Sequence, residues 1–244
     1  MNKLPFLLIL FFIATTVNIK QVKSQEVQIG IIGGGSSTWI FNKHITKAPS
    51  EEQTYIPSFG VNAGFTAEYV ISRTSAVWTG IFVGSHNQRY KGKELDYRSL
   101  VQWQKWSFPF VWKHKQRRGG GFIEGGFQFA SVSEILYTYN ATKQNESGPT
   151  RVLEDFKHNF LDLIVGVGKE QKIDLKKWIH LNGMYFIYGA RLSYSLTDLR
   201  GVDAYGRDLT KKEVLQTYYE GQYKPTHSAA LSAYLGIKYR IYRR

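Results

Sequence analysis

The sequence has no cysteine, only 6 prolines and no long apolar run beyond its N-terminal segment. The lack of cysteine excludes the disulfide framework that stabilises many small exported domains. The lack of a later apolar run excludes a further transmembrane helix, which would need about 20 apolar residues. Few prolines and 23 glycines favour β-structure with tight turns.

The first 24 residues have the layout of a secretory signal. Lys3 gives a positive start, an apolar run extends from 4 to 17, and Ser24 offers a small residue for cleavage. A membrane anchor is the alternative, but the run is short for a span. We therefore expect a cleaved signal peptide over 1–24 and a single domain over 25–244.

Acidic residues are few, with 19 against 32 lysines and arginines, and the formal charge is +13. A basic chain can bind nucleic acid, anionic lipid or an acidic protein. Export argues against nucleic acid, so lipid and a protein partner are the predicted classes.

Apolar and polar residues alternate strictly over 58–69. The odd positions from Phe59 to Tyr69 are apolar, and the even positions from Ser58 to Glu68 are small or polar. This period of two predicts a long β-strand with one apolar face and one polar face. Its length is sufficient for a membrane-spanning strand, which needs about 9–11 residues. The pattern favours a barrel with lipid outside and polar groups inside.

Seven further segments show related patterns, although the parity of the third is ambiguous. We expect a bend or a bulge at Gly33–Gly35 and an irregularity at Pro109. The eight predicted strands are 27–42, 56–72, 77–90, 98–113, 121–139, 159–168, 178–196 and 227–242.

Short connections alternate with mostly longer ones along these strands. The turns at 73–76, 114–120 and 169–177 are short, whereas 43–55, 140–158 and 197–226 are longer. Outer-membrane barrels have short periplasmic turns and longer external loops. The predicted fold is an all-β, eight-stranded antiparallel up-and-down transmembrane barrel. The barrel must be closed, because the backbone N–H and C=O groups of an open sheet edge would find no hydrogen-bond partner in hydrocarbon.

Four segments carry a family likeness, namely VQIGIIGG at 27–34, SFPFVWK at 107–113, GARLSYSLTD at 189–198 and LGIKY at 235–239. In their order and spacing the chain resembles the PorT-like family of small outer-membrane β-barrels of Gram-negative bacteria, which share the eight-stranded OmpA-type architecture. The resemblance implies a fold and an outer-membrane location. It does not imply one activity, because fold does not fix function.

Charged residues on the polar faces predict a lumen filled by paired charges, because buried charges must be paired to persist. A conduit or a catalytic carboxylate pair is the alternative. We expect Arg191 and Lys238 to need acids across the lumen, with Glu68 and Glu124 as candidates. The predicted inward set is Glu68, Glu124, Gln128, Glu134, Asp162, Arg191, Lys238 and Arg240.

Aromatic residues are predicted to form belts at the two lipid–water interfaces rather than a stacking surface for ligands. Trp112 and Trp178 would lie near the periplasmic side, and Trp39 and Tyr194 near the external side. The full predicted set is Trp39, Phe41, Tyr69, Trp103, Trp106, Trp112, Trp178 and Tyr194.

Two surfaces could meet partners. A basic run in a predicted periplasmic turn would contact lipid phosphates or dock an acidic protein. The loop 197–226 is the longest, could contain a short helix near Asp208, and is the best candidate for external binding. The predicted basic rim comprises Lys113, Lys115, Arg117 and Arg118.

The histidines show no metal-ligand spacing, and we expect no cofactor, metal or catalytic residue. Ser85 and His86 are adjacent on a strand and would point to opposite faces. The predicted function is a structural or partner-binding barrel in the bacterial outer membrane. The alternatives are a small channel, a lipid-modifying barrel enzyme, and a soluble lipocalin-like barrel.

Overall fold

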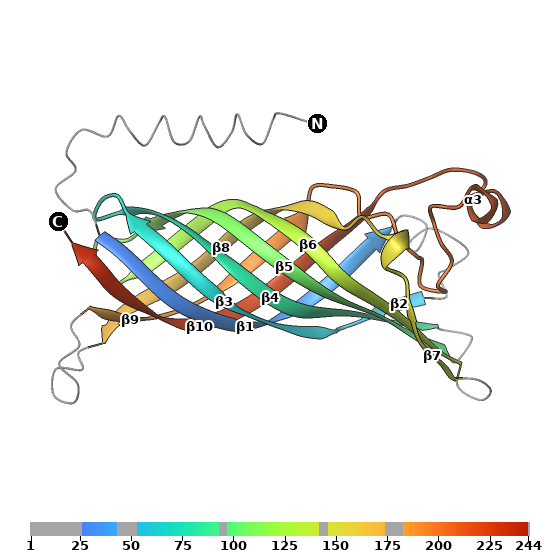
Figure 1. Cartoon of the computed structure of the whole chain (residues 1–244), viewed down its shortest axis with the longest axis horizontal. Coiled ribbons are helices and arrows are strands. Elements are labelled where there is room, and N and C mark those ends of the chain that lie inside the picture. The colour runs from blue at the N-terminus through green and yellow to red at the C-terminus, as the bar shows by residue number, and fades with distance from the viewer. Residues whose placement is uncertain (1–25, 43–52, 93–96, 142–145, 174–182, 244) are drawn as a thin grey trace.

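The computed structural model describes residues 26–42, 53–92, 97–141, 146–173 and 183–243. Eight long antiparallel strands close into a tilted barrel, with two short strands beside it (Figure 1). The ring consists of β1 (Glu26–Asn42), β3 (Phe59–Val70), β4 (Ser75–Gly92), β5 (Tyr97–Lys115), β6 (Gly121–Ala141), β8 (Asn159–Ile173), β9 (Met184–Ser195) and β10 (Thr226–Arg243).

The strand order is that of an up-and-down barrel. Each ring strand pairs with its neighbours in the chain, and β1 pairs with β10 to close the ring. Each of the eight predicted segments overlaps a ring strand, although the start of the seventh, residues 178–182, lies outside the described residues. Two short strands were not predicted: β2 (Gln53–Ile56) pairs with the last residues of β4, and β7 (Glu146–Arg151) pairs with β6.

The two ends of the barrel differ. Strand β1 begins and β10 ends at the left of Figure 1, which we call the terminal end. Strands β2 and β7 and the helix α3 (Lys212–Tyr218) lie at the right, which we call the loop end. The predicted short helix in the longest loop is therefore present.

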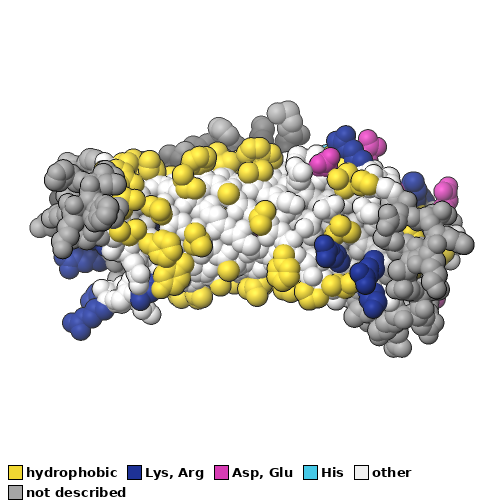
Figure 2. Space-filling view, turned by 90° about the horizontal axis from the view of Figure 1, so that it is seen from below, with side chains coloured by type: hydrophobic (Ala, Val, Ile, Leu, Met, Phe, Trp, Pro, Cys, Tyr) yellow, Lys and Arg dark blue, Asp and Glu magenta, His cyan; other side chains and the backbone are white. Residues whose placement is uncertain are grey.

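Outward side chains are mainly apolar along the barrel wall. On β3, Phe59, Val61 and Phe65 are 72%, 67% and 70% exposed, whereas Thr66 and Glu68, at alternate positions, are buried. Figure 2 shows hydrophobic side chains along the wall and Lys and Arg side chains gathered toward the two ends. This arrangement is opposite to a lipocalin-like barrel, which would hold its apolar residues inside.

The ambiguous third strand is resolved in favour of one parity. On β4, Trp78, Phe82 and His86 are buried in the interior, while Ile81 and Val83 are about half exposed on the wall. The even positions of β4 therefore face inward.

A β-bulge in β6 reverses one predicted face. Gln104 pairs with Glu134 and Lys105 pairs with Val132, so Ser133 is an extra residue. The extra residue shifts the side-chain alternation by one position. The prediction for Glu134 was therefore wrong: it shares the outward face with Gln104, and Ile135 is fully buried.

Two other expected irregularities have different outcomes. The ladders beside Gly33–Gly35 continue without a shift, and the register shift of β1 lies between Val27 and Gln28. The bulge prediction was wrong there. At Pro109 the β4–β5 pairing is interrupted, and Thr79 Oγ1 instead donates a hydrogen bond to the Pro109 carbonyl, 2.8 Å away.

The interior is filled by two hydrophobic clusters. One lies inside the barrel and includes Trp78, Phe82 and Tyr234. The other occupies the loop end, where Trp103, Ile135 and Tyr90 pack with residues of the connecting loops. An eight-stranded barrel is just wide enough to be filled by side chains in this way.

Candidate functional site

Charged side chains meet inside the barrel in three groups. The terminal-end cluster is Glu68, Lys113, Lys115, Glu170 and Lys238. The central cluster is Trp78, Glu124, Arg191 and Tyr234. The upper cluster is Lys105, Gln128 and Asp162.

The terminal-end cluster joins two carboxylates to three ammonium groups. Lys113 Nζ lies 2.7 Å from Glu68 Oε2 and 2.9 Å from Glu170 Oε1. Lys115 Nζ lies 2.5 Å from Glu68 Oε1 and 2.8 Å from Glu170 Oε2. Lys238 contacts both carboxylates as well. The side chains of Glu68 and Lys113 are at most 1% exposed, so the charges depend on one another rather than on water.

The central cluster surrounds Glu124 with donors. Arg191 Nε and Nη2 lie 3.0 and 2.9 Å from Glu124 Oε1. Trp78 Nε1 donates to Oε2 at 3.0 Å, and the Tyr234 hydroxyl donates to Oε1 at 3.1 Å. The guanidinium also lies over both rings, 4.7 Å from the centroid of Trp78 and 4.6 Å from that of Tyr234. This packing fixes the arginine and fills the lumen at that level.

The upper cluster is looser and borders a small polar cavity. Lys105 Nζ is 3.8 Å from Asp162 Oδ2, to which Gln128 donates at 3.1 Å. His86 contacts the hydroxyls of Ser36 and Thr38, each at 3.2 Å. The cavity between these groups has a volume of about 50 Å³. It is large enough for water and small for an organic substrate.

The structure extends the predicted lumen set. Arg191 meets Glu124 and Lys238 meets Glu68, the acids proposed for them from sequence. Arg240 lies apart from these pairs, with Nη1 3.5 Å from Glu26 Oε2.

The basic rim prediction was wrong for two residues. Lys113 and Lys115 belong to β5, which continues to Lys115, and both side chains enter the terminal-end cluster. Inward residues recur every second position, so the pair projects together into the lumen. Arg117 and Arg118 lie in the following turn and are exposed.

Sequence reasoning missed Lys105 and Glu170 as members of the interior set. Lys105 shares its parity with the buried Trp103 and Val101, a signal that was present in the sequence. Glu170 was assigned to a turn, but β8 continues to Ile173.

The residues of the predicted aromatic belt lie in different environments. Trp106, Trp112 and Tyr194 are 46%, 49% and 42% exposed on the wall. Trp39 is half-buried, and Trp178 lies outside the described residues. Trp103 does not belong to a belt: it is 2% exposed and stacks inside the barrel on Phe160, with ring centroids 6.1 Å apart.

The long loop between β9 and β10 seals the loop end of the barrel. Leu199, Val202 and Ala204 are buried in the loop-end hydrophobic cluster with Trp103 and Ile135. The Tyr137 hydroxyl donates to the Ala204 carbonyl at 2.9 Å. These contacts hold the middle of the loop against the inward side chains at the loop end.

A second set of contacts organises the outer part of the same loop. Arg207 Nη2 lies 2.6 Å from Asp203 Oδ2, and the guanidinium stacks on Tyr218, 4.3 Å from the ring centroid. The Tyr219 hydroxyl lies next to both Asp203 and Arg207. Together with α3, these residues form what we call the loop platform, residues 197–225.

Asp198 fixes the base of the loop platform. Its carboxylate accepts hydrogen bonds from the Arg200 and Thr226 N–H groups, each at 2.9 Å, and from the Tyr223 hydroxyl at 2.5 Å. Partial burial opposes ionisation, but these donors outweigh it and hold the pKa of Asp198 below its usual value. The carboxylate is thus ionised, and the clamp intact, at neutral pH.

Ser85 faces the wall and His86 the interior, so the adjacent pair does not form a nucleophile–base contact. Within the described ranges, no group of three or more His, Asp or Glu side chains is placed to hold a metal. No helix in those ranges has the length and hydropathy needed to cross a bilayer.

Comparisons with known proteins give fold-level similarity at low identity. No protein-family model matches the chain, and no curated protein is significantly similar to it. The outer membrane protein OprG from Pseudomonas aeruginosa is 10% identical with a TM-score of 0.41, covering 91% of this chain and 97% of that chain. The attachment invasion locus protein Ail of Yersinia pestis, solved with the heparin analogue sucrose octasulfate, is 10% identical with a TM-score of 0.38, covering 88% and 99%.

A third similar structure is Neisserial surface protein A, which is 10% identical with a TM-score of 0.34 and covers 87% of this chain and 96% of that chain. With TM-scores below 0.5, no functional inference follows from these three structures. The chain's own geometry is decisive: a closed eight-stranded ladder, an apolar wall and a charge-paired interior make it an integral β-barrel of the outer-membrane type.

Proposed function

We propose that this barrel is a membrane-embedded support that presents the loop platform to a protein partner outside the cell, without catalysis or conduction. The observation that carries the proposal is the loop platform itself. Its inner side is tied to the barrel by Tyr137 and Leu199, while Tyr218 and Tyr223 remain 55% and 42% exposed on its outer side. Exposed tyrosines on a preorganised loop are common contacts in recognition surfaces.

The filled interior supports a role other than transport. The three charged clusters and the two hydrophobic clusters occupy the lumen from the terminal end to the loop end. A channel would need a continuous polar path in their place. An enzyme acting through His86 would need access to a side chain that is 4% exposed and packs against Trp103 of the loop-end hydrophobic cluster.

We further propose that the terminal end is periplasmic, because outer-membrane barrels keep their termini and short turns on that side. Arg117 and Arg118 would then face lipid phosphates or an acidic periplasmic partner. PorT-like membership, which the four sequence segments suggest, and signal cleavage after Ser24 are part of the same proposal.

A photo-cross-linking amino acid at Tyr218, introduced in the native cell, tests the platform. We expect one discrete protein adduct, because Tyr218 ends α3 and its side chain is 55% exposed. The matched control is the same substitution at Tyr239, which is 38% exposed on the wall and should give no such adduct. Planar-bilayer recording of the purified barrel should show no unitary current. Current steps, or the absence of an adduct at both Tyr218 and Tyr223, would contradict the proposal.

A further inference from the structure

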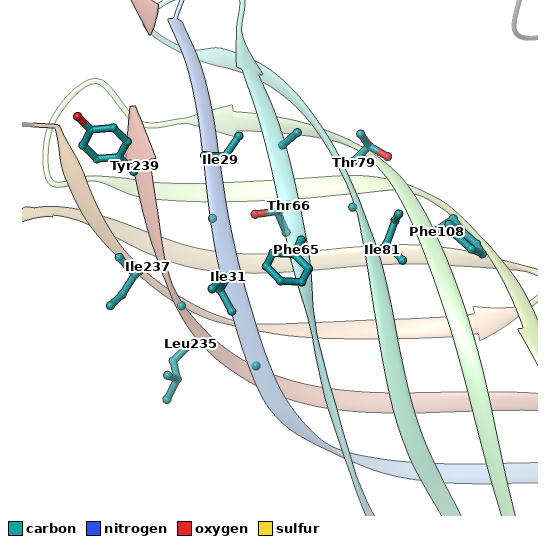
Figure 3. Close-up of a pocket in the computed structure, with 15 residues that line it drawn as sticks. Ile29, Ile31, Phe65, Thr66, Thr79, Ile81, Phe108, Leu235, Ile237 and Tyr239 are labelled. Atoms are coloured by element: carbon teal, nitrogen blue, oxygen red, sulfur yellow. The ribbon is translucent and has the colours of Figure 1, made fainter. Parts of the chain in front are cut away.

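An apolar groove crosses the outer wall of the barrel toward its terminal end (Figure 3). It encloses about 1160 Å³ and runs over five adjacent strands, β10, β1, β3, β4 and β5. Ile31, Phe65, Ile81 and Leu235 line it, and each is more than half exposed. The function proposed above does not use this groove.

The groove is hollow partly because one wall position carries no side chain. Gly33 is an outward residue of β1, paired with Ala63 on one side and Leu235 on the other. A Cβ at Gly33 would come no closer than 3.6 Å to a neighbouring atom, so a larger residue could be accommodated. The position is small without any steric requirement from the backbone, unlike the inward Gly30, where a Cβ would lie 2.5 Å from a carbonyl oxygen.

Positive charge lies beyond the terminal end of the groove. Strands β3 and β4, which both line the groove, are joined by a short turn that contains the exposed Arg73. The turn, residues 71–74, has no acidic residue. The next turn along the wall carries Arg117 and Arg118. Tyr69 lies between the groove and Arg73, at the level where an amphipathic ring suits a lipid–water interface.

An apolar groove with cations beyond one end, across an interfacial tyrosine, matches an acyl chain attached to an anionic headgroup. A protein partner would not require that order of chemistry along the wall. We propose that the groove holds one acyl chain of an anionic phospholipid, with the headgroup phosphate against Arg73. The whole wall contacts lipid without selecting one kind. This site, in contrast, would bind anionic phospholipid in preference to other lipids on one side of the barrel.

Native mass spectrometry of the folded barrel in detergent tests the site. The probes are phosphatidylglycerol and phosphatidylcholine with identical acyl chains. We expect the wild-type barrel to retain one phosphatidylglycerol in preference to phosphatidylcholine. Gly33→Leu fills the groove and should reduce retention roughly tenfold. Arg73→Gln should reduce it about fivefold and abolish the preference for phosphatidylglycerol.

Two matched variants separate the site from general effects. Gly35→Leu adds the same side chain two residues along the same face, at a position that also has open space and does not line the groove. Arg98→Gln removes an exposed arginine at the loop end. Both should retain lipid as the wild type does. Heat-modifiable migration in gels verifies folding independently of lipid.

Three results would overturn the proposal. The first is equal retention of the two lipids by the wild-type barrel. The second is unchanged retention in both Gly33→Leu and Arg73→Gln. The third is a dimeric barrel that Gly33→Leu converts to a monomer without changing lipid retention, which would assign the groove to a second copy of the chain. None of these outcomes depends on whether the loop platform binds a partner.

Discussion

Glu68→Gln should lower the free energy of unfolding by about 3–5 kcal/mol, the range found when one partner of a buried ion pair is removed. Glu68 pairs with all three lysines of the terminal-end cluster. The substitution leaves Lys113, Lys115 and Lys238 with the single carboxylate of Glu170. Urea unfolding of the barrel in lipid vesicles, monitored by tryptophan fluorescence, measures the loss.

The charge balance of the cluster gives this prediction an internal control. Lys238→Met removes one of three cations and leaves two lysines with two carboxylates, so it should be tolerated much better than Glu68→Gln. Glu134→Gln, at the wall position beyond the β-bulge, should change stability by less than about 0.5 kcal/mol. Equal losses for Glu68→Gln and Lys238→Met would contradict the account of the cluster.

Trp103→Ala should also cost about 3–5 kcal/mol, the range for deleting a large buried aromatic side chain. Trp103 is 2% exposed and contacts the rings of Phe160 and His86 below the loop platform. Its loss opens a cavity in the hydrophobic cluster that anchors Leu199. We therefore expect faster hydrogen exchange in the loop platform as well as reduced stability.

The neighbouring tryptophan on β5 is the matched control. Trp106 is 46% exposed on the wall, where lipid can fill the space left by its side chain. Trp106→Ala should therefore cost clearly less than Trp103→Ala and leave hydrogen exchange in the loop platform unchanged. If the two variants behaved alike, Trp103 would not be the anchor described here.

The periodic strands were the most predictable part of this molecule. On β3, the apolar residues from Phe59 to Tyr69 alternate with small or polar residues, and this pattern predicted the strand. Matching alternation in the later strands, together with the alternating connection lengths, predicted its outward face. The reason is physical, since a wall between lipid and a polar interior imposes strict two-residue alternation.

Strand ends and bulges could not be predicted in the same way. Lys115 and Glu170 were assigned to turns because charged residues near a strand end resemble turn residues in sequence. Their backbone pairing with Phe122 and Ile187 continues the strands, and their side chains meet across the lumen. The extra residue at Ser133 reversed Glu134 and Ile135 for a similar reason, because a bulge depends on the opposite strand.

The contacts of the loop platform were beyond sequence reasoning. The sequence indicated a long loop with a short helix, and both are present. The pairing of Asp203 with Arg207 and the seating of Ala204 on Tyr137 depend on tertiary contacts that have no periodic signature.

The central claim is that the outward face of the wall contacts lipid. Because the chain has no native cysteine, single cysteines at Phe59, Val61, Ala63, Phe65, Ala67 and Tyr69 can each carry a spin label without further substitutions. In vesicles, we compare how accessible each spin label is to oxygen, which partitions into lipid, and to a water-soluble nickel complex. The ratio of oxygen accessibility to nickel accessibility should be highest near Ala63 and Phe65 and should fall toward both ends of β3. A uniformly high accessibility to nickel along the strand would contradict the membrane-spanning barrel.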